Sequence, residues 1–143
     1  MWKNIYDSFF QILTIPWNEY LQKYTDCGKL VMDKFYISIY PLSGVLLVVS
    51  TLLLCIIYYY WFNLRFGKFY KRKSYFFFMI INSFVIGLIS FIVAKSYLAK
   101  FNCTVTSQYL NFGVINFTYG AVLFFIVSIL IKKWSPMGKK TPF

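Results

Sequence analysis

The residues that could carry out chemistry are few, and their types exclude most kinds of catalytic or metal site. The chain has no histidine, so it lacks the commonest general base and the commonest metal ligand. Its three cysteines, Cys27, Cys55 and Cys103, share no CxxC spacing, which leaves a zinc site or a redox motif without support. We therefore expect a protein that is not an enzyme and that binds neither a cofactor nor a metal ion.

The charged residues argue against two further classes of protein. All four acids lie in the first quarter of the chain, whereas proton relays and cation-coupled transporters usually need a carboxylate inside the membrane. The 15 basic residues give a formal net charge of +11, but they flank long apolar runs. We interpret them as topology signals and contacts with anionic lipid headgroups, and we do not expect nucleic-acid binding.

The composition is that of a membrane protein, because 59% of the residues are hydrophobic and only 13% are charged. Three apolar stretches, at about 42–62, 75–94 and 112–131, have the roughly 20 residues that a helix needs to cross the hydrocarbon. The sequence predicts an all-α integral membrane protein with three transmembrane helices, preceded by an amphipathic N-terminal helical arm. Its regions would be an arm at 1–40, a transmembrane region at 41–131 and a basic extended tail at 132–143.

The basic residues also predict an orientation. The loop between the first two spans has five cations and no acid: Arg65, Lys68, Lys71, Arg72 and Lys73. Four more lysines follow the third span, on the same side of the membrane. The positive-inside rule places that side in the cytoplasm or matrix, and the N-terminus outside, in a bacterial or organellar inner membrane.

The N-terminal segment shows the clearest helical periodicity. Apolar and aromatic residues recur at spacings of three and four, at Trp2, Ile5, Tyr6, Phe9, Leu13, Trp17, Tyr20 and Leu21. The helix would break near Pro16. Its aromatic face could lie in the outer headgroup plane or dock on a partner protein. We favour the partner, because the polar face mixes acids with bases instead of being rich in lysine.

Small residues mark the faces on which the three spans would pack closely. The second span has such a stripe at four positions, and the other two spans have weaker ones; together they comprise Ser83, Gly87, Ser90, Ala94, Gly44, Thr51, Gly113, Asn116 and Gly120. These faces could pack on one another, or one could receive a helix from another subunit. For Asn82 and Asn116 we expect interhelical hydrogen bonds, although a pore or substrate contact is the alternative.

Two features concern the membrane boundaries. Tyr58, Tyr59, Tyr60 and Trp61 crowd one end of the first span, where aromatic rings with a polar edge favour the headgroup level. Cys27 and Cys103 would both face the oxidising side, so a disulfide could join the N-terminal segment to the second loop. The alternative is two unrelated thiols.

Two functional hypotheses follow. The first is a non-catalytic structural or accessory subunit of a larger membrane complex, such as an envelope secretion or motility machine or a respiratory assembly, with other membrane-protein subunits as partners. It depends on the aromatic arm, the small-residue stripes and the absence of a catalytic constellation. The second is a small oligomeric pore-forming effector, or the membrane immunity protein that opposes one. A pore would have to be lined by Asn82, Ser83 and Asn116.

Overall fold

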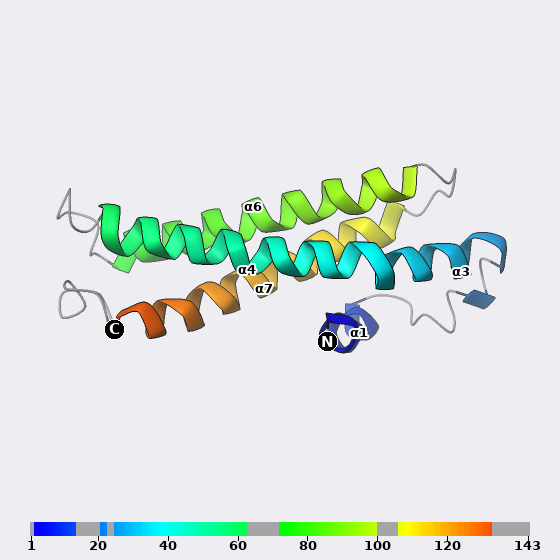
Figure 1. Ribbon diagram of the computed structural model, residues 1–143, viewed down its shortest axis with the longest axis horizontal. Helices are drawn as coiled ribbons and strands as arrows, with labels where there is room; N and C mark the ends of the chain where they lie inside the picture. Colours follow the sequence, from blue (N-terminus) through cyan, green and yellow to red (C-terminus); the bar gives the residue numbers. More distant parts are fainter. Residues whose placement is uncertain (1, 14–20, 23–24, 63–71, 100–105, 133–143) are drawn as a thin grey trace.

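The described part of the chain is entirely helical. The structure is a computed structural model that describes residues 2–13, 21–22, 25–62, 72–99 and 106–132. Three long helices lie side by side along the length of the molecule, and a short helix, α1 (Trp2–Leu13), lies against their side (Figure 1). All three long helices are long and apolar enough to cross a membrane.

The first long helix is built from four consecutive segments without a gap. These are α3 (Thr25–Lys34), the π-helical turn η1 (Phe35–Ile39), α4 (Tyr40–Ile56) and the π-helical turn η2 (Ile57–Phe62). The candidate membrane span within it, Cys27–Trp61, has 35 residues, which corresponds to about 50 Å of helix and exceeds a hydrocarbon core of about 30 Å. The helix therefore begins well before the predicted start at residue 42.

The π-helical turn η1 has a local cause. Pro41 lies two residues after its end, in the first turn of α4. A proline inside a helix has no N–H to donate, and its ring clashes with the carbonyl four residues earlier. The backbone N–H of Tyr40 bonds to the carbonyl of Phe35, five residues back. The wider turn thus lets the helix pass through the proline instead of starting at it.

The other two long helices, α6 (Arg72–Ala99) and α7 (Thr106–Lys132), make the closest contact in the bundle. A Cβ atom placed on Gly87 would lie 2.9 Å from the Gly113 carbonyl oxygen, and one on Gly113 would lie 3.1 Å from that of Gly87. Gly120 is similarly close to Ser83, with 3.1 Å to its Cα. The glycines permit this approach because any larger side chain would push the two backbones apart.

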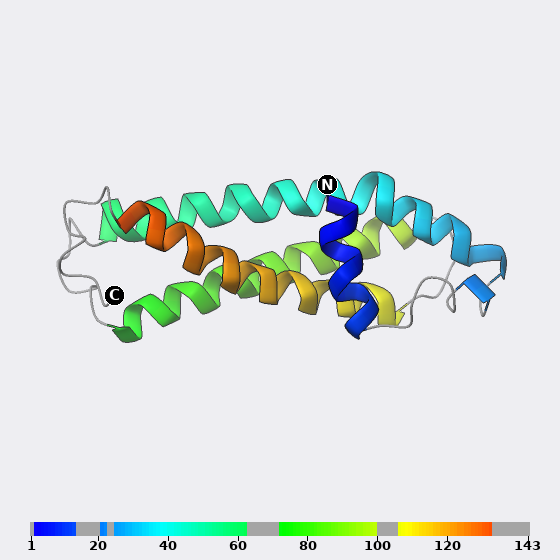
Figure 2. The same ribbon diagram turned by 90° about the horizontal axis from the view of Figure 1, so that it is seen from below.

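The short helix α1 crosses the bundle instead of extending it. Figure 2 shows α1 nearly at right angles to the long helices, and its contacts are with α4 and α7. On the side where α1 lies, α4 and α7 diverge, so α1 covers the gap between them (Figure 2).

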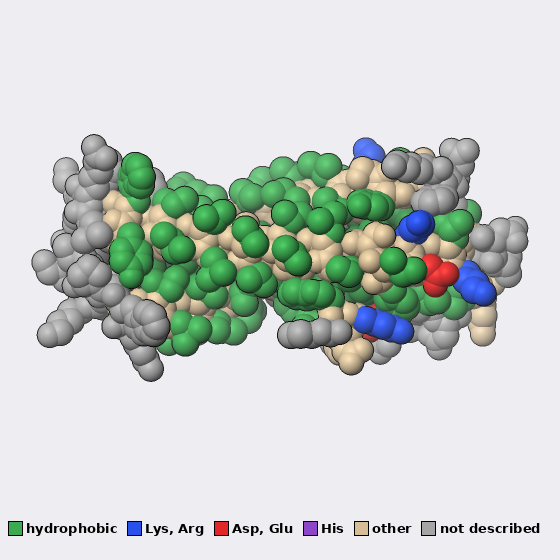
Figure 3. Space-filling model, viewed as in Figure 1, with side chains coloured by type: hydrophobic (Ala, Val, Ile, Leu, Met, Phe, Trp, Pro, Cys, Tyr) green, Lys and Arg blue, Asp and Glu red, His purple; other side chains and the backbone are tan. Residues whose placement is uncertain are grey.

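The surface agrees with a membrane-crossing bundle. Hydrophobic side chains cover the middle of the molecule, and the charged side chains in view gather near the end formed by α3 (Figure 3). Large apolar residues on all three long helices are exposed, among them Leu53, Phe84 and Leu130. In water such a surface would be unfavourable, whereas in a bilayer it faces lipid.

Two of the four predicted boundary aromatics lie inside the bundle. Tyr58 and Tyr59 are buried and pack in a cluster with Tyr75 and Phe78, while Tyr60 and Trp61 are exposed. The four residues belong to the π-helical turn η2, where more residues per turn bring successive side chains closer together in angle, so two of them can point inward. Tyr58 and Tyr59 therefore pack inside the bundle, and of the four aromatics Tyr60 and Trp61 are the two that face its surroundings.

Candidate functional site: a clasp between the N-terminal helix and the bundle

Two hydrogen bonds in opposite directions join α1 to α7. The Tyr6 hydroxyl donates to Asn116 Oδ1 at 2.7 Å, and the Tyr119 hydroxyl donates to the backbone carbonyl of Ile5 at 2.6 Å. The Asn116 amide nitrogen donates to the Phe112 carbonyl in its own helix at 3.0 Å. Both polar atoms of the buried amide are thereby satisfied, as an apolar environment demands. We call this set of contacts the clasp.

Aromatic rings surround the Tyr6 end of the clasp. The Tyr6 side chain is 1% exposed and stacks on Tyr40 with ring centroids 4.7 Å apart and an angle of 24° between the planes. The ring centroid of Phe112 lies 5.3 Å from that of Tyr6, and the Tyr119 ring meets the Tyr6 ring edge-on with centroids 5.6 Å apart. Burial raises the pKa of Tyr6 well above its usual range, and the nearby Tyr119 adds to the effect. The hydroxyl is therefore a hydrogen-bond donor at any physiological pH.

Trp2 is the second anchor of α1. Its indole ring covers Gly44, where an added Cβ would lie 2.5 Å from a ring atom. A glycine at this position of α4 lets the flat ring lie directly on the helix backbone. This is a reason for Gly44 that differs from the α6–α7 contact, because here the neighbour is a side chain of α1.

The exposed side of α1 carries its charges. Lys3 Nζ lies 4.3 Å from the centre of the Tyr36 ring, in a cation–π contact, and Asp7 shares a side-chain hydrogen bond with Tyr36. Lys3, Asn4 and Ser8 are exposed. The opposite charges of α1 thus meet one tyrosine in the π-helical turn η1 of the first long helix.

A second polar contact lies at the centre of the bundle. Asn82 Nδ2 of α6 donates to Thr51 Oγ1 of α4 at 3.3 Å and to the Gly120 carbonyl of α7 at 3.1 Å. One side chain therefore joins all three long helices. The interhelical hydrogen bonds expected for Asn82 and Asn116 are both present, but the sequence did not indicate that the partner of Asn116 would be α1.

A third buried group lies toward the other end of the bundle. Cys55 Sγ lies 3.7 Å from Ser128 Oγ and 3.9 Å from the Phe124 carbonyl oxygen. Tyr59 and Tyr75 lie beside the same serine. Cys55 is a free, buried thiol, so this group packs helices and offers no accessible nucleophile.

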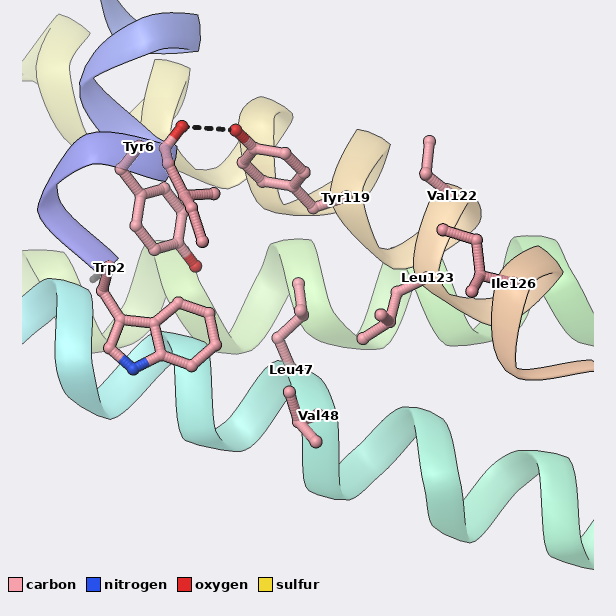
Figure 4. Close-up of a pocket in the computed structure, with 9 residues that line it drawn as sticks. Trp2, Tyr6, Leu47, Val48, Tyr119, Val122, Leu123 and Ile126 are labelled. Carbon is pink, nitrogen blue, oxygen red and sulfur yellow. Dashed lines mark hydrogen bonds between the residues drawn. The ribbon is translucent and has the colours of Figure 1, made fainter. Parts of the chain in front are cut away.

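An apolar cavity of about 300 Å³ opens beside the clasp (Figure 4). It lies between the first turn of α1 and the facing sides of α4 and α7, with Trp2 and Tyr6 at one end. Leu47 and Val48 line it from α4, and Figure 4 shows Val122, Leu123 and Ile126 along its α7 side. The lining is almost entirely apolar, and the hydroxyls of its two tyrosines, Tyr6 and Tyr119, are used in the clasp.

The predicted arm is only partly within the described residues. Trp2 and Tyr6 contact the chain's own bundle, Ile5 contributes its carbonyl to the clasp, and Leu21 is half-buried. Trp17 and Tyr20 lie outside the described residues, as do the side chains of Phe9 and Leu13. The side chains of Trp2 and Tyr6, which the sequence analysis assigned to lipid headgroups or a partner protein, thus contact the chain's own bundle.

The small-residue positions lie inside the chain's own fold. Each of the nine is buried: Ser83, Gly87, Ser90, Ala94, Gly44, Thr51, Gly113, Asn116 and Gly120. They pack the three spans and α1 on one another. A helix from another subunit would therefore meet a different face, made of the large exposed apolar side chains.

Of the remaining predicted positions, those that the structure describes lie near the ends of helices. Arg72 and Lys73 are exposed in the first turn of α6, whereas Arg65, Lys68 and Lys71 lie outside the described residues. Cys27 is disulfide-bonded. Its expected partner, Cys103, lies outside the described residues, so the Cys27–Cys103 pairing stays a prediction.

Sequence reasoning missed the clasp and the inward-facing tyrosines. The amphipathic pattern identified Tyr6 as part of an apolar face but not the surface that this face covers. Tyr119 carried one available signal, since it lies three residues after Asn116 on the same helix face.

Comparison with protein-family models, curated proteins and solved structures found no significant match to this chain. Within the described ranges, no group of three or more histidine, cysteine or acidic side chains could hold a metal ion. The fold and the clasp define the class only as an all-helical chain with three helices of membrane-crossing length. The function must be argued from the contacts themselves.

Proposed function

We propose that this chain is an integral membrane protein that acts as a non-catalytic structural or accessory subunit of a larger membrane complex. The observation that carries the proposal is the way the interior polar groups are used. Asn82 joins three helices, and Asn116 holds α1 through Tyr6. These contacts fix one arrangement of helices, as an anchor requires.

The same contacts favour an anchor over a pore. A pore would need Asn82, Ser83 and Asn116 to face a lumen, yet all three are at most 1% exposed and contact neighbouring helices of the same chain. Opening a lumen along them would break the hydrogen bonds that hold the bundle together. Partners would instead meet the exposed apolar faces of the long helices, which do not need to reorganise.

The orientation remains that given by the basic residues, with the N-terminus outside and the C-terminus on the cytoplasmic or matrix side. Arg72, Lys73 and Lys132 begin α6 and end α7, so they lie at one end of the antiparallel bundle. Anionic headgroups would meet this end. The setting is a bacterial or organellar inner membrane.

The test is purification of the tagged full-length chain from its own host in a mild detergent. Other membrane proteins that co-purify in fixed stoichiometry, and that chemical crosslinks join to the exposed apolar faces, would support a subunit. A homo-oligomer that conducts ions in liposomes, with conductance lost in both Asn82→Leu and Asn116→Leu, would overturn the proposal in favour of a pore.

A further inference from the structure

The cavity beside the clasp is one end of a longer apolar seam between α4 and α7. Beyond it, a second cavity of about 410 Å³ is lined by Leu52, Ile56, Tyr60, Leu130 and Ile131. On the first long helix the lining residues follow one another every four positions, from Val48, Leu52 and Ile56 in α4 to Tyr60 in η2, and on α7 Leu130 follows Ile126 at the same spacing. Residues four apart are neighbours on a helix surface, so the linings of the two cavities adjoin along both helices, and we call the two cavities together the seam.

The dimensions of this seam suit an extended hydrocarbon chain. From Leu47 to Tyr60 the helix rises by about 20 Å, which is somewhat more than half of a hydrocarbon core of about 30 Å. The lining is almost entirely apolar along this length. Exposed Leu52, Ile56, Val122 and Ile126 form its rim, so the seam is open from the lipid side. A compact polar ligand would find few hydrogen-bonding groups there, because the polar side-chain atoms of the lining are limited to those of its tyrosines and Trp2.

The charge at its far end distinguishes one class of lipid. Ile131 of the lining is followed directly by Lys132, the last residue of α7. Tyr60 places a phenol at the same end, and α6 begins there with Arg72 and Lys73. At the opposite end, the seam stops against the indole of Trp2 and the ring of Tyr6. A negative headgroup is therefore favoured at the Lys132 end, with the end of the chain beside Trp2.

We propose that the α4–α7 seam binds one acyl chain of an anionic phospholipid, with its headgroup at Lys132 and its methyl end in the cavity beside Trp2. The proposal rests on the membrane insertion proposed above, but not on assembly with partner subunits. The lipid would fill space that α1 leaves between the diverging helices, and it would add contacts to Trp2 and Val122 that the protein lacks.

The first experiment measures how strongly lipids are immobilised by the full-length chain in phosphatidylcholine vesicles. Spin-labelled phosphatidylglycerol should show an immobilised component larger than that of spin-labelled phosphatidylcholine. Val122→Trp fills the seam and should abolish the difference. Val114→Trp is the matched control, because both valines belong to α7 and are half-exposed, at 51% and 50%, but Val114 lies on the α6–α7 side.

The headgroup end is tested by Lys132→Gln. It should lower the preference for phosphatidylglycerol over phosphatidylcholine by about fivefold, the ratio that corresponds to about 1 kcal/mol for one cation near an anionic lipid. An unchanged preference in Lys132→Gln, or equal loss in Val122→Trp and Val114→Trp, would overturn the proposal.

The second experiment needs no change to the seam and so stands even if Val122→Trp does not fold. In a chain whose other three tryptophans, Trp17, Trp61 and Trp134, are replaced by phenylalanine, Trp2 should be quenched more by phosphatidylglycerol brominated at the chain end than by the same lipid brominated beside the carbonyl. The reverse order would place the headgroup at α1 and overturn the assignment.

Flotation with the vesicles reports insertion separately: a chain that floats but immobilises no lipid loses only the lipid site, whereas one that does not float contradicts the proposed function as well.

Discussion

Tyr6 and Asn116 are joined by a 2.7 Å hydrogen bond although 110 residues separate them in the sequence. The bond connects the first helix to the middle of the last. The Asn116 amide nitrogen bonds to Phe112 within α7, whereas the amide oxygen accepts its hydrogen bond from Tyr6 of α1. A hydrogen bond depends on direction, whereas the apolar contacts around it do not. The Tyr6–Asn116 bond therefore fixes the position of α1 on the bundle and does not merely hold it there.

Removing the Tyr6 hydroxyl should loosen α1 without unfolding the bundle. Tyr6→Phe keeps the stacking on Tyr40 and Phe112 but leaves the buried Asn116 oxygen without its donor, at a cost of about 1–2 kcal/mol. Amide hydrogen exchange in α1 should accelerate about 5- to 30-fold, while exchange in α6 and α7 stays the same. Ser8→Ala is the control, because its exposed hydroxyl bonds only to Asn4 in the same helix. Equal exchange in the two variants would show that the clasp does not hold α1.

High pH should weaken the same contact. Burial raises the pKa of Tyr6, so the folded chain holds this proton more tightly than the unfolded chain, in which tyrosine ionises near about pH 10. The stabilisation is then complete below about pH 10 and decreases as the pH rises above it. In denaturant unfolding in micelles, the difference between wild type and Tyr6→Phe should be constant from neutral pH to about 10 and shrink beyond. A difference that grows with pH would have the wrong sign for this explanation.

The sequence predicted well those features that membrane thickness determines, such as helix length. It predicted poorly those that depend on contact with a particular neighbouring residue. Three apolar stretches predicted three long helices, because hydrocarbon thickness requires that length. The start of the first long helix was misplaced at residue 42, since a π-helical turn accommodates Pro41 and no composition rule anticipates it.

Burial was harder to predict than position. Small residues pack helices in any membrane bundle, so the sequence could indicate Gly87 and Gly113 but not that they face each other. An amphipathic arm has an apolar face whatever it covers, so the docking of Trp2 and Tyr6 on α4 and α7 depends on the gap between two helices. That gap is a property of the assembled bundle, which no local pattern contains.

Two glycines should respond differently to the same substitution. In Gly87→Ala the new methyl would meet the Gly113 backbone carbonyl, which cannot move without separating α6 from α7, so we expect a loss of about 1–3 kcal/mol in bundle stability. In Gly44→Ala the obstacle is the Trp2 ring, which can swing away. Its fluorescence and the exchange of α1 should change, with bundle stability nearly unaffected. Global destabilisation by Gly44→Ala, or none by Gly87→Ala, would contradict these contacts.

Making the centre of the bundle more apolar should destabilise it. Asn82→Leu removes two hydrogen bonds and leaves Thr51 and the Gly120 carbonyl without the donor that joins α4, α6 and α7. Interhelical hydrogen bonds in membranes average about 0.6 kcal/mol, so the loss should be about 1 kcal/mol or somewhat more. Thr118→Val is the control, because Thr118 is exposed and bonds only to Val114 in its own helix. The free energy of unfolding is measured in mixed micelles. If Asn82→Leu is more stable than wild type, the amide has no structural role.

The cysteines allow a test that counts adducts. Cys55 is free and buried between Ser128 and the Phe124 backbone, and Cys27 is disulfide-bonded. A polymer-linked maleimide that shifts the protein on a gel should add nothing to the folded chain, one group to the chain unfolded without reductant, and three after reduction. If Cys27 pairs with Cys103, Cys27→Ser should release the second thiol and raise the unreduced, unfolded count from one to two with Cys55 still reactive. If Cys27 were instead bonded to a second chain, wild type would run as a dimer without reductant and would give two adducts per chain, because Cys103 would be free to react.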